Sequence, residues 1–227
     1  MPRFRVALMA SAIFVSATGA ASAADLPAAP LVPVTPVFSW TGFYVGANVG
    51  YGWGNSSGNM ITTGLPDTFS TSGNAFVGGG QMGFNYQFGG GFVLGAEADF
   101  QGSFGSGTLT DSDGLINATV KDPWFGTIRG RIGYAMDRVL LYGTGGAVFG
   151  DAIANGTSAG IAFNDSATYW TWTAGVGAEW AFAGPWSAKV EYLYAGAPSA
   201  IPTIPGVGSV SETSHTNLIR GGLNYHF

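Results

Sequence analysis

Residues 186–194 read WSAKVEYLY, and their side chains alternate in character from one position to the next. Trp186 and Val190 fall on one side of an extended chain. Lys189 and Glu191 fall on the other side, because successive side chains of a β-strand point to opposite faces. The two charges stand out in a chain of which only 9% of the residues are charged. The alternation predicts a strand with one apolar and one polar face.

The N-terminal region has the composition of a secretory signal peptide. Arg3 and Arg5 precede an apolar run that is too short for a transmembrane helix and ends in small residues at 21–23. The segment after it carries four prolines and predicts an extended leader, which we place in the periplasm. The predicted organisation is a signal peptide at 1–23, a Pro-rich leader at 24–39 and a folded domain at 40–227.

Composition limits the classes of function. The chain has 8 basic and 13 acidic residues, and without Arg3 and Arg5 the balance is 6 against 13, a net charge of −7. This balance argues against a nucleic-acid partner, because phosphates require clustered Lys and Arg. The absence of cysteine excludes disulfides and thiolate metal sites. After the signal peptide no segment approaches the roughly 20 apolar residues of a spanning helix, so any membrane protein made from this chain is a barrel.

Eight stretches of roughly 10 to 16 residues repeat the alternation, with the length and rhythm of membrane-spanning strands. We place them at 42–53, 74–88, 91–101, 123–135, 139–150, 168–182, 186–194 and 214–227. Tight turns near 89–91, 136–138 and 184–185 alternate with long segments rich in Gly, Ser, Thr and Asp at 54–73, 102–122, 151–167 and 196–213. This pattern predicts an all-β fold, an eight-stranded antiparallel up-and-down transmembrane β-barrel, with turns and termini in the periplasm and long loops outside.

A soluble β-sandwich also alternates, and the aromatic residues separate the two folds. The polar faces of a sandwich meet water and carry many charges, whereas the polar faces here carry few charges and much Gly, Asn, Gln and Thr. The large aromatics lie at the ends of the apolar faces, as Trp124 and Tyr134 do. Two aromatic bands around small aliphatic residues are what the interfaces of a bilayer select, which favours the membrane barrel.

One stretch, 139–150, is ambiguous because both of its faces are apolar or small. We place Leu141, Ala147 and Phe149 on its outer face. Tyr142 and Thr144 are then expected to point inward.

Every charge placed within a strand falls on the inward face, four acids and four bases in all. The set is Glu97, Asp99, Arg129, Arg131, Glu179, Lys189, Glu191 and Arg220. A central Lys or Arg on the lipid face would cost about 2 to 4 kcal/mol, which fixes the parity of these strands. Counting from the turns puts all of them at mid-membrane depth, with Glu179 opposite Lys189 and Glu191 opposite Arg220. Gly83 is expected opposite Glu97, where it leaves room for the carboxylate.

An eight-stranded barrel is only wide enough for side chains to fill it. Four acids and four bases, each desolvated unless paired, would then plug the lumen rather than line a pore. We expect them to serve packing and register, with Glu179, Lys189, Glu191 and Arg220 forming a four-charge patch where the last strands close. A narrow ion path is the alternative. A catalytic Lys–Glu pair is disfavoured because no substrate cleft is evident, so no enzyme activity is predicted.

The two histidines are the remaining candidates for chemistry. His226 is penultimate, and we place it at the periplasmic rim with no partner in view. His215 follows Ser214 near Glu212, and we place it at the outer rim. A single histidine without a second ligand does not predict a metal or haem site. We therefore assign no catalytic, cofactor-binding or metal-binding residue.

Four stretches together resemble the small alphaproteobacterial outer-membrane β-barrel family, the porin-family or opacity-like surface antigens, within the OmpA/OmpX-like eight-stranded class. They are WTGFYVGANVGYGWG (40–54), RVLLYGTGGAVFG (138–150), WSAKVEYLY (186–194) and IRGGLNYHF (219–227). In that class a C-terminal aromatic preceded by alternating apolar residues resembles the signal read by the barrel assembly machinery. Leu223, Tyr225 and Phe227 match that signal.

The resemblance implies a location in the outer membrane, among its lipid and lipopolysaccharide. We expect a monomeric integral barrel with a structural or surface-interaction role and a lumen plugged by polar side chains. Two alternatives remain open: a low-conductance porin for small solutes, or a surface adhesin or haem-binding protein that acts through its long loops.

Overall fold

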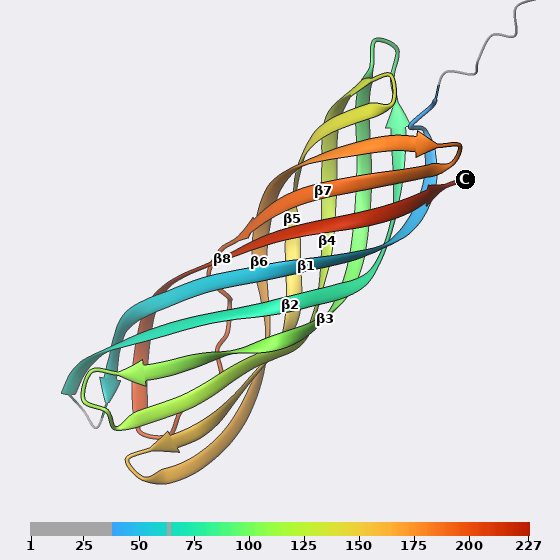
Figure 1. The fold of residues 1–227 in the computed structure, drawn as a ribbon. Coiled ribbons are helices and arrows are strands. Elements are labelled where there is room, and N and C mark those ends of the chain that lie inside the picture. The colour runs from blue at the N-terminus through green and yellow to red at the C-terminus, as the bar shows by residue number, and fades with distance from the viewer. Residues whose placement is uncertain (1–37, 63–64) are drawn as a thin grey trace, which may run out of the picture. The chain divides into compact units, whose positions relative to one another are not determined.

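The computed structural model describes residues 38–62 and 65–227. Eight antiparallel strands close into a barrel in chain order (Figure 1): β1 (Gly42–Thr62), β2 (Leu65–Gln87), β3 (Phe92–Asp111), β4 (Ile116–Met136), β5 (Val139–Ser158), β6 (Ile161–Ala183), β7 (Trp186–Ala195) and β8 (Val207–His226). Pairing of β1 with β8 completes the ring. The predicted fold class is confirmed. The predicted signal peptide and most of the predicted Pro-rich leader lie outside the described residues.

The two ends of the barrel differ in their connections. Short turns join β2 to β3, β4 to β5 and β6 to β7 at one end, where the C-terminus also lies (Figure 1). Positive φ angles occur in these turns at Gly90, Gly184 and Asp137. Glycine adopts such angles without a steric cost. We call this the short-turn end and the opposite end the hairpin end. The described part of the chain has no helix of a length and hydrophobicity that could span a bilayer.

Most strands are longer than the sequence predicts. All except β7 run 20 to 23 residues, whereas β7 has 10. The segments 54–73, 102–122 and 151–167, predicted as long loops, are mostly strand and form extended hairpins. The predicted loop after β7 is irregular over residues 196–206. The predictions were wrong here because an antiparallel ladder can continue through Gly-, Ser- and Thr-rich chain wherever both partners stay extended.

The outer face of the barrel carries the predicted apolar side chains. Ile128, in the middle of β4, is 62% exposed. Phe92 packs against Tyr134 on the short-turn side, and Phe100 stacks on Trp124 on the hairpin side, each with ring centroids 5.4 Å apart. From Trp124 to Tyr134 the strand rises roughly 24 Å at about 3.4 Å per residue and a tilt of about 45°, close to the ~25 Å apolar band of an outer-membrane barrel.

The ambiguous strand β5 has the predicted orientation. Leu141, Ala147 and Phe149 are exposed on the outer face. Tyr142 and Thr144 are buried in the interior.

Candidate functional site: the charge network of the barrel interior

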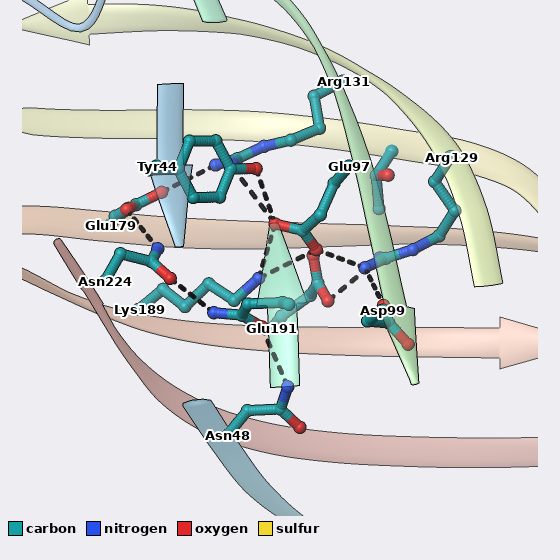
Figure 2. A network of polar contacts seen from close by, with 12 residues as sticks. Tyr44, Asn48, Glu97, Asp99, Arg129, Arg131, Glu179, Lys189, Glu191 and Asn224 are labelled. Carbon is teal, nitrogen blue, oxygen red and sulfur yellow. Dashed lines mark hydrogen bonds and ion pairs between the residues drawn. The ribbon is translucent and has the colours of Figure 1, made fainter. Parts of the chain in front are cut away.

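The barrel interior holds all eight charged residues that the alternation assigns to it. They come from β3 (Glu97, Asp99), β4 (Arg129, Arg131), β6 (Glu179), β7 (Lys189, Glu191) and β8 (Arg220), and their exposed fractions are 1 to 6%. Figure 2 labels all of these side chains except Arg220 and shows them pointing toward one another. Four acids and four bases are therefore buried together, which is tolerable only where each charge has a partner.

Glu97 lies at the centre of this network. The Lys189 ammonium donates to both of its carboxylate oxygens, with Nζ–O distances of 2.9 and 2.7 Å. The guanidinium groups of Arg131 and Arg220 lie 3.4 and 3.3 Å from the same carboxylate, and Arg129 also pairs with it. One carboxylate thus contacts all four cations.

Two further carboxylates lie on the hairpin side of Glu97. Asp99 pairs with Arg129 and Arg220, each at 2.9 Å, and accepts a hydrogen bond from the Thr127 hydroxyl at 2.7 Å. Glu191 pairs with the same two arginines, at 3.0 and 2.7 Å. Both arginines are therefore shared between carboxylates of different strands, and the network crosses the lumen instead of following one ladder.

Glu179 forms the short-turn side of the network. It pairs with Arg131 at 2.7 Å and accepts hydrogen bonds from Ser187 and Asn224, both at 2.6 Å. His226 Nε2 lies 3.4 Å from Glu179 and 3.0 Å from Ser187. The expectation that His226 has no partner in view is therefore wrong, because His226 is the last residue of β8 and lies on its inward face, as Arg220 and Asn224 do.

The predicted strand registers are confirmed. Glu179 lies opposite Lys189, and Glu191 lies opposite Arg220. The predicted four-charge patch is correct only in part: Arg220 does pair with Glu191, but Lys189 pairs with Glu97 across the lumen. The flexible four-carbon side chain of Lys189 lets its ammonium group reach a carboxylate on the far wall of the barrel. Its partner therefore need not be the residue opposite it in the β-ladder.

Two tyrosines that sequence reasoning did not single out as part of the network complete it. The Tyr44 hydroxyl donates to Glu97 at 2.7 Å and accepts from Arg131 at 2.6 Å. The Tyr142 hydroxyl donates to Glu191 at 3.0 Å, and its ring lies 3.9 Å from the Arg131 guanidinium carbon. The signal that could have identified them is an inward tyrosine opposite a glycine.

Each tyrosine ring lies over the glycine opposite it in the neighbouring strand. Tyr44 pairs with Gly83, and Tyr142 pairs with Gly177. A Cβ atom added at either glycine would collide with the tyrosine ring. Gly83 does lie opposite Glu97, as predicted. The space that it leaves is filled by the Tyr44 ring, whose hydroxyl then reaches the carboxylate.

A tryptophan just before β1 closes the short-turn end. Trp40 is fully buried, its backbone N–H donates to the Gln87 side chain at 3.0 Å, and its indole N–H donates to the Asp137 carbonyl at 3.3 Å. Phe38 packs against Trp40 and His226 with centroid distances of 4.9 and 5.5 Å. These aromatic rings separate the charge network from the solvent at this end.

The remaining candidates lie apart from the network. His215 stacks on Tyr194 near the hairpin end, with ring centroids 6.2 Å apart. Within residues 38–62 and 65–227, no three His, Asp or Glu side chains gather in a geometry that could hold a metal ion. Leu223, Tyr225 and Phe227 are exposed on the outer face of the last strand and its end. Their role as an assembly signal stays a prediction.

Chemically, the network holds its charges in place and leaves little for a substrate. The four carboxylates have 0% side-chain exposure and each contacts at least one cation. A general base or nucleophile needs a lone pair that a reacting atom can approach. The geometry therefore suits structural bracing.

Comparison with known proteins assigns the family. The model of the outer membrane protein beta-barrel domain matches residues 10–227, which is nearly the whole chain. The chain belongs to this outer-membrane β-barrel family. The family assignment, and the strand architecture that agrees with it, place the protein in the outer membrane.

Two bacterial outer-membrane proteins are similar to this chain in sequence. The 31 kDa outer-membrane immunogenic protein of Brucella melitensis biotype 1 is 37% identical over 98% of this chain and 98% of its own length. The 22 kDa outer membrane protein of Rhizobium leguminosarum bv. viciae is 33% identical over 86% of this chain and 82% of its own. Among solved structures, the outer membrane protein OprG of Pseudomonas aeruginosa is 12% identical, with 82% and 97% of the two chains covered and a TM-score of 0.47.

Proposed function

We propose that the protein is a structural barrel of the outer membrane whose lumen is closed to solutes and whose long hairpins project from the cell surface. The observation that carries this proposal is the ion network centred on Glu97, which joins β3, β4, β7 and β8 across the lumen. Passage of an ion would require these pairs to separate in a water-poor interior, where breaking one pair costs about 3 to 5 kcal/mol.

The hairpins supply the surface part of the proposal. A strand needs about 9 to 11 residues to cross the outer membrane, and most strands here have 20 to 23. About half of each long strand therefore extends beyond the bilayer. The name of the Brucella relative, an immunogenic protein, is in keeping with hairpins that antibodies can reach.

Planar-bilayer recording tests the closed lumen. We expect the wild-type protein to give no steady conductance steps. The double variant Glu97→Ala with Arg129→Ala removes one acid and one base, keeps the interior neutral and opens space, so it should give small steps. Heat-modifiable gel migration checks that both proteins are folded. Steady steps from the wild type would refute the closed lumen.

Surface labelling tests the position of the hairpins. A cysteine introduced at Asp113, in the exposed turn between β3 and β4, should react with a membrane-impermeant maleimide on intact cells. A cysteine at Asp137, in the short turn between β4 and β5, should react only after the outer membrane is permeabilised. The reverse result would invert the proposed orientation.

A further inference from the structure

The interior changes character one side-chain layer beyond the charge network. On β7 the next inward residue after Glu191 is Leu193, and on β8 the inward residue before Arg220 is Leu218. These two leucines and Val77 of β2 are buried together, and Phe125 of β4 packs against them. An apolar floor therefore covers the charges on their hairpin side.

A second apolar cluster lies nearer the tips of the hairpins. Its buried members are Met60, Phe69 and Ile116, and Leu109, Ile204 and Val207 pack against them. Ile204 belongs to the irregular segment 196–206, so this segment folds inward over the barrel. The second cluster acts as a roof, and it is separate from the floor.

A cavity of about 330 Å³ contacts both clusters. The roof contributes Met60 and Phe69, and the floor contributes Leu193 and Leu218. Between the floor and the roof, the walls of the cavity carry small side chains such as Ala152, which leave the space open. Ligand sites typically measure about 300 to 1,000 Å³, and an apolar cavity of about 150 Å³ accommodates benzene. There is room for a bicyclic aromatic molecule.

The charges of the lining restrict what can bind. Among the described residues that line the cavity, Asp122 is the one carboxylate, and none is a lysine or arginine. The other polar groups of the lining include amides and hydroxyls, such as those of Asn74 and Tyr169, and the imidazole of His215. An anion would lose its hydration beside a carboxylate with no cation to compensate, which is unfavourable. An uncharged molecule loses little hydration and gains contact with both clusters.

We propose that this cavity binds a small uncharged hydrophobic molecule, up to the size of a bicyclic arene, between the Leu193–Leu218 floor and the Met60–Phe69 roof. The site is blind, because the charge network lies beneath the floor. It is a binding site beyond the structural role proposed above. Its occupancy is independent of whether the lumen conducts, so either proposal can fail alone.

Methyl NMR of the refolded full-length mature barrel in detergent micelles, titrated with naphthalene, tests the site. The methyl signals of Met60, Leu193 and Leu218 should shift saturably. The side chains of Leu94 and Leu223 are exposed and face the detergent. Their methyl signals should drift without saturation, because they report partitioning of naphthalene into the micelle. The proposal would be overturned if the signals of the cavity methyl groups drifted without saturation, as those of the detergent-facing methyl groups do.

A matched pair of variants on β5 sharpens the test. Ala152→Phe fills the cavity and should weaken naphthalene binding at least tenfold. Ala147→Phe, on the outer face of the same strand, should leave it unchanged. Saturable binding that a folded Ala152→Phe protein retains in full would place the ligand elsewhere and overturn the proposal.

A charged analogue tests the site in the wild-type protein alone. Naphthalene-2-sulfonate has the same ring system with one negative charge and should bind at least tenfold more weakly than naphthalene. Equal binding of the two would contradict the proposed preference for uncharged molecules, even if the Ala152→Phe protein does not fold.

Discussion

Lys189 on β7 and Glu97 on β3 meet across the barrel interior, with Nζ 2.7 Å from Oε2, although 92 residues separate them in the chain. The residue directly opposite Lys189 in the β6–β7 ladder is Glu179, which pairs with Arg131 at 2.7 Å. The barrel is therefore braced through its interior as well as around its wall. The stability of the barrel should depend most on the residue that joins the largest number of strands.

Glu97→Gln should be the most destabilising single neutralisation in the interior. It leaves the four cations that contact Glu97 around an uncharged amide, and breaking a buried pair costs about 3 to 5 kcal/mol. Urea unfolding in lipid vesicles measures the free energy of unfolding. Asp113→Asn, in an exposed turn, is the control and should change it by less than about 0.5 kcal/mol. Equal stability of both variants would contradict a central role for Glu97.

Combining Glu97→Gln with Lys189→Met should be less destabilising than the sum of the single changes. The double variant removes an acid and its base together, so no unpaired charge remains from this contact. Contacting residues show coupling energies of about 0.5 to 3 kcal/mol. The same unfolding assay on all four proteins of the cycle gives the coupling. Strict additivity would show that the pair does not interact in solution.

Gly83→Ala should destabilise the barrel by about 1 to 3 kcal/mol, because the added methyl group collides with the Tyr44 ring and overpacks the interior. Gly80→Ala on the same strand is the control, since its methyl group would have ordinary contacts. Adding Tyr44→Phe to Gly83→Ala should not restore stability, because the ring remains. A Gly83→Ala protein as stable as the Gly80→Ala control would rule out the ring-over-glycine packing.

Ile128→Arg should cost about 2 to 4 kcal/mol, because it puts a cation on the outer face near the bilayer midplane. Ile161→Arg begins from a similarly exposed isoleucine, 66% against 62%, but lies at the tip of the β5–β6 hairpin. It should cost about 0 to 1 kcal/mol. The ratio of folded to unfolded protein in vesicles measures both, and similar costs would mean that the bilayer covers the hairpins as well.

Much of the architecture could be predicted from sequence because it depends on local rules. Alternation of side chains gives the strands and their faces, and the cost of a charge in lipid fixes which face points inward. Counting residues from the turn at Gly184 then gives the opposition of Glu179 and Lys189. The sequence pattern predicts strands that are too short at the hairpin end, because the Gly- and Ser-rich residues there lack the strong apolar face that marks the membrane segments.

The sequence by itself determined the eight strands, the inward face and the neutral set of four acids and four bases. The tertiary structure decided which acid pairs with which base, that Tyr44 and Trp40 complete and cover the network, and that a cavity separates two apolar clusters. The reason is physical. Strand parity is set by neighbours along the chain and by the bilayer, whereas a partner across the lumen depends on how far each side chain reaches once the ring has closed. Lys189 therefore binds Glu97, and Glu179, its neighbour in the ladder, binds Arg131.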